Sequence, residues 1–261
     1  MLRESGYYSF RFLPTFSEAI TNVPRTVRKA DSLHGLRETP SYGLAEAARY
    51  LRIPISTLKS WVVGRSYPTQ GGTKQFKPLI KAPSMATGPQ LLSFMNLVEI
   101  HVLDAIRRQH KISLPKVRTA LDFLHTKLPS KHPLADQSFQ TYGGDLFVEK
   151  YGDLINITKS GQLAIRTLIA AHLHRIERDS HGVPVKLYPF TRTRQDDEPR
   201  VVVIDPEIAF GRPVLASTGI PTAIIADRLK AGESVDELAS DYGRSQEEII
   251  DAIRCELPSA A

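Results

Sequence analysis

The chain has 261 residues, of which 41% are hydrophobic, so it can bury a core, and its length usually divides into two domains. Its single cysteine, Cys255, excludes an intramolecular disulfide and a zinc site of several thiolates, and it fits a reducing compartment. The net charge is +6, the N-terminus does not resemble a signal peptide, and no apolar run reaches the ~18 residues of a membrane span, so we expect a cytoplasmic protein without membrane contact.

The charge is distributed unevenly along the chain. Residues 42–132 carry 14 Lys and Arg against 4 Asp and Glu, a net charge of +10, whereas residues 201–261 carry 5 against 11, a net charge of −6. The other two segments are nearly neutral, with +2 over residues 1–41 and 0 over residues 133–200. A basic stretch is most often a solvated face, but affinity for nucleic acid also comes largely from Lys and Arg. The basic segment therefore suits a phosphate-binding surface, and the acidic one would be repelled by phosphate.

The first 40 residues show no clear hydrophobic period. Their aromatic residues are scattered among Pro14, Pro24 and Pro40, which predicts a loosely attached arm. We expect the folded part of the chain to begin near Tyr42.

The stretch EAARYLRIPISTLKSW, residues 46–61, predicts two short helices joined by a tight turn. Apolar residues recur at helical spacing up to Leu51, Pro54 interrupts them, and a second helix restarts at Ser56. Such a pair can hold a helix in the major groove of DNA, or it can be a piece of helical core. We expect Leu58 and Trp61 to be core residues.

A glycine- and proline-rich basic segment follows the two helices and suits a wing hairpin beside the second helix. If that second helix enters a groove, its first turns meet base edges or phosphates, and the wing contacts mainly phosphates. The candidate DNA-binding residues are Ser56, Thr57, Lys59 and Ser60 on the helix, and Arg65, Lys74 and Lys77 on the wing.

The middle of the chain predicts further helices and one hairpin. Helical periodicity marks residues 91–109, and a second helix begins near Ser113 with Pro115 in its first turn. The stretch DLFVEKYGDLINIT predicts a hairpin that turns at Gly152 and Asp153. A further helix is expected from Ser160 to Ile176, followed by a strand-like VPVKLYPF and the polar linker TRTRQDDEPR.

The C-terminal segment begins with the strand-like VVVID and ends in three short helices with clear boundaries. Pro221 opens the first helix and Gly232 stops it. Capping boxes formed by Ser234 with Glu237 and by Ser245 with Glu248 begin the other two. The run ELASDYGRSQEEIIDAI could itself be a second helix-turn-helix, but the charge of −6 favours packing and protein binding.

Two parts of the chain resemble known families. The run YGLAEAARYLRIPISTLKSW, the basic wing and the helix pair after it resemble the MerR-like winged helix-turn-helix. That family often has Ser or Thr where this chain has Gly43, and its usual dimerisation helix and effector domain are not evident. The segments GRPVLASTGIP, LKAGESVDELASDY and EEIIDAI resemble the domain of unknown function numbered 433, although Ser217 and Gly219 replace its usual Gly and Arg. Together the two parts resemble one subgroup of VapB-type antitoxins.

The resemblance implies a function as an antitoxin. It implies a cognate PIN-like ribonuclease toxin that the chain binds and neutralises, and an operator through which the chain represses its own operon. PIN-type sites are carboxylate clusters that hold Mg²⁺ or Mn²⁺, so an inserted cationic side chain could block them. The candidate toxin-binding residues are Arg192, Arg194, Arg200 and Arg212. The alternative is a free-standing MerR-like transcriptional regulator that senses a small molecule.

An enzyme is the less favoured hypothesis. His172 and His174 would lie about 200° apart on a helix, too far to share a metal ion, and the chain contains no glycine-rich phosphate loop and no Gly-x-Ser-x-Gly motif. We therefore expect no catalytic residues, metal site or cofactor. Because helix-turn-helix proteins usually read two half-sites and the VVVID and PVLAS segments offer strand edges, we expect a homodimer or a larger assembly with toxin.

The fold predicted from these patterns is mainly α with small β hairpins. Residues 1–40 form an extension or arm, residues 41–190 a winged helix-turn-helix domain with trailing helices and a hairpin, and residues 191–200 a linker. Residues 201–261 form a small three-helix module with short strands, which binds toxin, mediates dimerisation, or does both.

Overall fold

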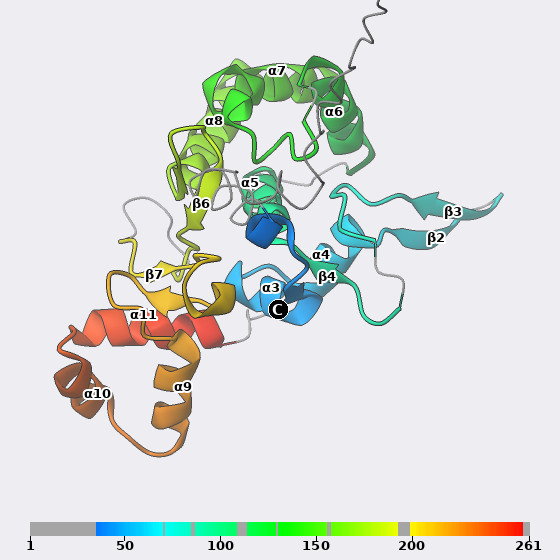
Figure 1. Ribbon diagram of the computed structural model, residues 1–261. Helices are drawn as coiled ribbons and strands as arrows, with labels where there is room; N and C mark the ends of the chain where they lie inside the picture. The colour runs from blue at the N-terminus through cyan, green and yellow to red at the C-terminus, as the bar shows by residue number, and fades with distance from the viewer. Residues whose placement is uncertain are drawn as a thin grey trace, which may run out of the picture. The chain divides into compact units, whose positions relative to one another are not determined.

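Helices dominate the computed structural model, which describes residues 35–69, 71–84, 87–108, 114–128, 130–155, 158–192 and 199–257 (Figure 1). Its strands form short antiparallel pairs, so the predicted fold class is confirmed. The predicted N-terminal arm lies outside the described residues up to residue 34.

The predicted two-helix unit is present. Helix α3 spans Leu44–Tyr50 and helix α4 spans Ile55–Val62. Gly43 stands at the N-terminus of α3 and has no side chain to cap it, but its N–H donates to the Glu46 carboxylate at 2.9 Å. Half of a capping box therefore remains. The side chains that join the two helices are buried, among them Ala47, Ala48, Leu58 and Trp61.

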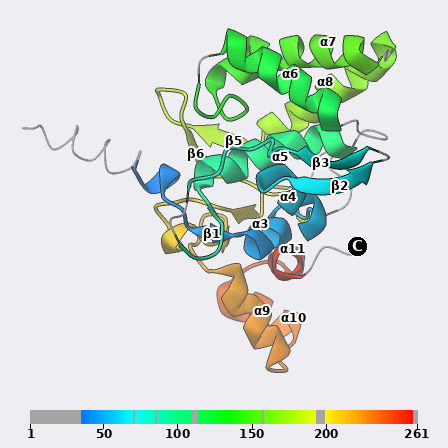
Figure 2. The same ribbon diagram turned by 90° about the vertical axis from the view of Figure 1, so that its right-hand side faces the viewer.

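The predicted wing is also present. Strand β2 (Arg65–Thr69) pairs antiparallel with strand β3 (Gly72–Phe76), and Figure 2 shows this hairpin close to α4. A second pair, β1 (Tyr42–Gly43) with β4 (Leu91–Leu92), ties the entrance of α3 to the segment before the next helix. The two-helix unit is thus connected to the rest of the fold from both ends.

Helix α5 (Phe94–Arg108) is the central helix of the chain. Ser93 and Asn96 cap it reciprocally, because the Ser93 N–H donates to Asn96 Oδ1 at 3.1 Å and the Asn96 N–H donates to Ser93 Oγ at 3.2 Å. Its apolar and polar residues are both buried, and the buried polar ones include Glu99, His101 and Asp104. A helix buried all round lies inside a protein rather than on its surface.

The predicted hairpin at Gly152 and Asp153 is wrong, because this segment is helix α7 (Gly144–Ile155). Phe147, Val148 and Tyr151 are buried on one face, at spacings that fit a helix better than a strand. Gly152 is tolerated inside the helix, where it permits close packing against the following helix: a Cβ there would lie 2.6 Å from Gln162 Nε2. Close packing, rather than a turn, accounts for this glycine.

Helices α6 (Leu114–Lys127) and α8 (Lys159–Leu173) pack on either side of α7, and α8 also packs on α5. A short π-helical turn at Phe139–Gly143 leads into α7. The predicted start of α8 near Ser160 is nearly right, since Thr158 caps it by accepting from the Gly161 N–H at 3.2 Å.

The helix that contains Leu173 ends earlier than predicted. Ile176 lies in strand β5 (Ile176–Arg178), which pairs antiparallel with β6 (Pro184–Leu187). A bridge from Leu187 to Ile204 then connects this hairpin to the C-terminal segment. The chain therefore passes from the helical layer to the C-terminal module through strands.

The C-terminal module contains the three predicted helices. They are α9 (Thr222–Lys230), α10 (Val235–Tyr242) and α11 (Gln246–Glu256), and the two predicted capping boxes begin α10 and α11. Strand β7 (Val202–Val203) pairs with β8 (Val214–Leu215) in the same chain. The two segments expected to offer edges to a second copy thus bond to each other.

The expected linker at residues 191–200 does not act as the only attachment of this module. From Leu36 onward the described residues form one compact unit. At the start of the expected linker Thr191 is buried, and Arg192 binds the fully buried carboxylate of Asp251 on α11. A carboxylate buried away from water needs a cationic or hydrogen-bonding partner, and Arg192 provides one. This segment is therefore polar partly because Arg192 forms an ion pair inside the protein, and not only because the segment is exposed to solvent.

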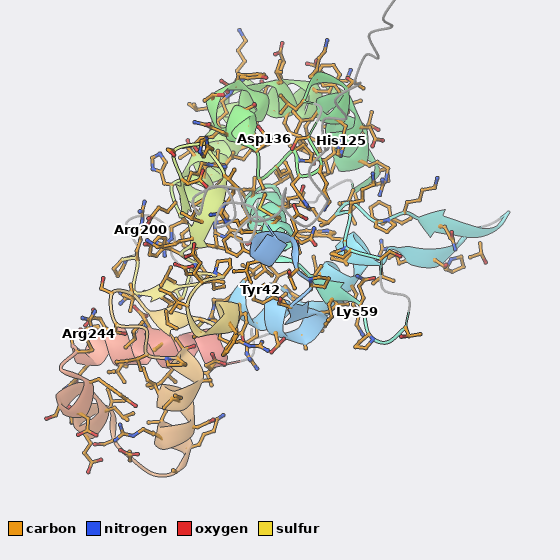
Figure 3. All side chains as sticks on the ribbon, in the orientation of Figure 1. Tyr42, Lys59, His125, Asp136, Arg200 and Arg244 are labelled. Atoms are coloured by element: carbon orange, nitrogen blue, oxygen red, sulfur yellow. The ribbon has the colours of Figure 1, made fainter. Side chains whose placement is uncertain are left out.

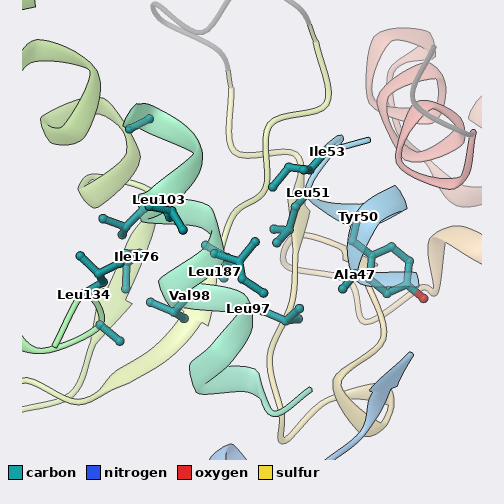
Figure 4. Close-up of a cluster of buried hydrophobic side chains, with 14 of the residues drawn as sticks. Ala47, Tyr50, Leu51, Ile53, Leu97, Val98, Leu103, Leu134, Ile176 and Leu187 are labelled. Carbon is teal, nitrogen blue, oxygen red and sulfur yellow. The ribbon is translucent and has the colours of Figure 1, made fainter. Parts of the chain in front are cut away.

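One hydrophobic core joins these elements, apart from the wing strands β2 and β3. Figure 4 shows part of it, with Leu51 and Ile53 after α3 near Leu97 and Val98 of α5 and Leu187 of β6. Within the core the rings of His101 and His172 lie 4.8 Å apart, and burial lowers the pKa of His101 well below its usual value. His101 is therefore a packed, neutral ring at physiological pH.

Candidate functional site

The outer face of α4 carries three of the seven predicted DNA contacts. Lys59 is exposed (Figure 3). Ser56 is also exposed, and Thr57 is half-buried. Ser60 departs from the prediction, since only 8% of its surface is exposed and its hydroxyl has no hydrogen-bond partner among the described residues. A side chain this buried does not reach a groove, so Ser60 is removed from the proposed contacts.

The wing begins at a position that only glycine can occupy. Gly64 has φ of +83°, and a Cβ there would lie 2.3 Å from the carbonyl oxygen of Phe76. The chain can therefore turn from α4 directly into β2, which places Arg65 at the first position of the wing. Arg65 and Lys77 are both exposed, and both lie at the base of the hairpin, where Arg65 pairs with Phe76. The side chain of Lys74 lies outside the described part of the chain.

The segment after the wing is attached to α4 and to α6. The carbonyl oxygen of Trp61 accepts from the N–H groups of Leu79 and Ile80 at 2.7 and 3.0 Å. The Arg118 side chain donates to the carbonyl oxygens of Lys77 and Pro78. These hydrogen bonds connect the base of the hairpin to two helices, α4 and α6. They therefore fix the position of the wing relative to α4, and with it the positions of the cations on both. We call α4 and the wing together the frame.

A cavity of about 560 Å³ lies beneath this frame. It is lined by apolar residues such as Val62 and Leu121 and by the cations Lys81 and Arg118. Its volume is within the range of small-molecule sites. The cavity is the feature that best fits the alternative hypothesis of a regulator that senses a small molecule.

The acidic module contacts the two-helix unit directly, along a surface that we call the seam. The seam consists of Tyr42, Glu46 and Arg49 on one side, and of Gly211, Arg212 and Glu256 on the other. The Tyr42 hydroxyl donates to the carbonyl oxygen of Gly211 at 3.1 Å, Arg49 pairs with Glu256 at 3.2 Å, and Arg212 pairs with Glu46. Burial raises the pKa of Tyr42, so this hydroxyl remains protonated and keeps donating. The seam contacts α3 rather than the exposed face of α4.

The predicted toxin-contacting arginines that the structure describes all have partners within the chain. Arg192 binds Asp251 through Nε and Nη2, with the shortest contact at 2.6 Å, and Arg212 pairs with Glu46. Arg200 donates to the carbonyl oxygen of His174 and lies over the Tyr188 ring at 5.2 Å from its centroid. Arg194 lies outside the described residues. These contacts come from packing between distant segments, which composition does not reveal.

Sequence reasoning missed one residue of the module, Phe210. This side chain is 95% exposed, and it lies in a turn where Ala209, Phe210 and Gly211 all have positive φ. The one signal in the sequence is a large apolar side chain between the run Asp205-Pro206-Glu207 and the GRP motif. This signal does not by itself distinguish a buried residue from an exposed one.

No other chemistry emerges from the described part of the chain. Its His, Cys, Asp and Glu residues form no group of three or more that could hold a metal ion. None of its helices has the length and apolar character needed to cross a membrane.

Two families match separate parts of the chain. Residues 40–121 match the family described as "Putative DNA-binding HTH domain", and residues 202–254 match "Protein of unknown function (DUF433)". The first match covers the two-helix unit, the wing and the helices behind them. The second covers most of the acidic module.

Similar proteins occur in Mycobacterium tuberculosis (strain ATCC 25618 / H37Rv). The protein named "Putative antitoxin VapB45" is 31% identical over 232 residues, which cover 83% of this chain and 93% of that protein. "Uncharacterized protein Rv2308" is 25% identical over 232 residues, covering 85% and 92%. The crystal structure of Rv2018 from Mycobacterium tuberculosis superimposes with a TM-score of 0.61 at 26% identity, and covers 82% of this chain and 98% of that one.

Proposed function

Because the chain belongs to the VapB-type antitoxin family, with a helix-turn-helix domain followed by a DUF433 module, we propose that it neutralises a cognate PIN-like ribonuclease and represses its own operon. The observation that carries this proposal is the joining of two oppositely charged parts in one compact unit. A net charge of +10 over residues 42–132 suits DNA, and a net charge of −6 over residues 201–261 suits a protein partner.

In the DNA-binding part, α4 enters the major groove with Ser56, Thr57 and Lys59 toward the DNA, while the wing cations contact phosphates. Arg65, Lys74 and Lys77 are the proposed wing contacts. The chain acts as a homodimer or in a larger assembly with toxin, because operators of such proteins have two half-sites.

In the toxin-binding part, the acidic module holds the ribonuclease and a cationic side chain blocks its carboxylate site. Arg192 is not retained for this role, since its departure would leave the buried Asp251 carboxylate with less compensation. Arg194, Arg200 and Arg212 remain the proposed candidates. Arg212 would exchange its pair with Glu46 for a toxin carboxylate, and in this way toxin binding would alter the seam and α3.

The DNA contacts can be tested with the double substitution Lys59→Ala and Arg65→Ala in the full chain. We expect the binding free energy for the operator to weaken by about 1–3 kcal/mol for each of the two side chains that binds a base. For each one that binds a phosphate, the slope of the logarithm of the binding constant against the logarithm of the salt concentration should become less steep by about one. Gel-shift titrations over a series of salt concentrations measure both. Lys230→Ala, an exposed lysine on the acidic module, is the matched control and should change neither. Unchanged affinity and slope in the double variant would refute this placement of α4.

The antitoxin function can be tested with the product of the adjacent gene, which we expect to be the PIN-like ribonuclease. We expect the two proteins to copurify, and the full chain to suppress metal-dependent RNA cleavage at a one-to-one ratio of the two proteins. A fluorescent RNA cleavage assay measures this, with a catalytically active toxin alone as the reference. The antitoxin function is wrong if the two proteins do not associate and this chain does not change the rate of RNA cleavage by the ribonuclease. The free-standing regulator is then the better hypothesis, and the cavity is the site to test.

A further inference from the structure

Phe210 is exposed to a degree that folding does not explain. Its side chain is 95% exposed, compared with 63% for Leu163 and 57% for Val63 among the other exposed large apolar residues that the structure describes. Burial of a phenylalanine is normally worth about 1.5–3 kcal/mol, and the chain gains almost none of this at Phe210.

The backbone that carries Phe210 is also unfavourable by itself. Ala209, Phe210 and Gly211 have φ of 48°, 54° and 76°, so two residues with a Cβ adopt a conformation that costs each of them about 1–2 kcal/mol. Such strain persists only where surrounding contacts impose it. Backbone outliers of this kind occur preferentially at functional sites.

Several hydrogen bonds impose the conformation. The Gly211 N–H donates to the Ile208 carbonyl at 2.9 Å and the Arg212 N–H to the Ala209 carbonyl at 3.0 Å. On the far side of the turn, the buried Tyr42 hydroxyl donates to the carbonyl oxygen of Gly211. The turn is therefore held at its base, and Phe210 is presented in one orientation before any partner binds. Preorganisation of this kind lowers the entropic cost of association.

The surroundings of Phe210 indicate the chemistry of the partner. Glu207 is exposed and Ile208 is 38% exposed, while the exposed cation Arg212 is paired with Glu46. The module as a whole carries a net charge of −6. Nucleic acid would be repelled by this charge. A protein with an apolar pocket beside a basic surface fits it, and a ribonuclease carries such a basic surface where it holds its RNA.

We propose that Phe210 is the anchor through which the acidic module binds its toxin, inserting into an apolar pocket next to the basic RNA-binding surface of that ribonuclease. The proposal rests on the antitoxin function proposed above, and it adds the residue that dominates the interface. Aromatic side chains at the centre of an interface commonly supply most of the binding energy. The position of Phe210 beside the seam also places the bound toxin close to α3.

The substitution Phe210→Ala in the full chain tests this anchor against the ribonuclease encoded next to it. We expect affinity measured by calorimetry to fall at least about 30-fold, the ratio that corresponds to a hot-spot residue, and RNA cleavage to be restored accordingly. Phe210→Leu, which keeps an apolar side chain, should recover part of the affinity. Leu163→Ala on α8 is the matched control for removal of an exposed apolar side chain, and it should bind like the unmodified chain.

The outcomes separate the anchor from the antitoxin function. If the unmodified chain binds and inhibits the ribonuclease and Phe210→Ala does so equally well, the anchor is wrong and the function stands. If the unmodified chain does not bind, both proposals fall. Light scattering tests whether Phe210 instead contacts a second copy of this chain. If the unmodified chain is a dimer, and Phe210→Ala is a monomer that keeps its affinity for the toxin, Phe210 belongs to the dimer contact. That result also overturns the anchor.

Discussion

Replacement of Arg192 by alanine is expected to lower the free energy of unfolding by about 3 kcal/mol, because it removes the main partner of a buried charge. The Asp251 carboxylate is fully buried, and Arg192 reaches it with Nε at 3.0 and 3.1 Å and with Nη2 at 2.6 Å. Only Arg254, whose Nη1 lies 2.8 Å from Asp251 Oδ1, would then compensate it among the partners that the structure describes. Urea denaturation followed by circular dichroism measures the change.

The matched control is Arg254→Ala, which leaves the two-pronged Arg192 interaction in place. It should cost less than Arg192→Ala, since one hydrogen bond is removed instead of three. The single variant Asp251→Ala and the double variant Arg192→Ala with Asp251→Ala complete a double-mutant cycle, which gives the coupling energy of the pair. A destabilisation below about 1 kcal/mol for Arg192→Ala would show that the pair behaves like an exposed salt bridge, and that the attachment of the module depends on apolar contacts.

Replacement of Gly211 by alanine is expected to destabilise the chain by about 2–4 kcal/mol, from backbone strain together with a disrupted hydrogen bond. Gly211 has φ of +76°, and an added Cβ would lie 2.2 Å from the Tyr42 hydroxyl oxygen and 3.2 Å from the ring carbon that carries it. Tyr42 is 2% exposed and leads into α3, so its displacement should also weaken operator binding. Denaturation and gel-shift titrations measure the two effects.

Two variants separate the clash from the strain. Gly219→Ala also has positive φ, at +74°, but its Cβ would meet nothing closer than 3.9 Å, so it should show the backbone cost alone. Tyr42→Phe in the Gly211→Ala background removes the hydroxyl that the new Cβ meets, and should recover part of the stability. If Gly211→Ala is no more harmful than Gly219→Ala, the packing of the seam around Tyr42 is looser than the structure indicates.

Features whose causes lie within a few neighbouring residues could be predicted before the fold was known. Helical periodicity and Pro54 predicted α3 and α4, glycines and prolines predicted the wing, and the pairs Ser234–Glu237 and Ser245–Glu248 predicted the starts of α10 and α11. Caps and turns act over three or four positions, so they are legible without the fold. The separation of +10 from −6 is likewise a property of the chain alone, and the two proposed functions, DNA binding and protein binding, were assigned to the two parts from it.

Features that depend on contacts between distant segments could be recognised only in the folded chain. Gly152 marks close helix packing rather than a hairpin turn, and Arg192 is paired with Asp251, 59 residues away, rather than free in a linker. Tyr42 meets Gly211 across 169 residues, and Phe210 is exposed because its turn is held from that side. The amino-acid composition is the same whether these residues are buried, paired with each other or exposed to a partner, so it cannot distinguish these states. The choice depends on which surfaces the folded chain brings together, since burial and pairing are properties of the packed molecule.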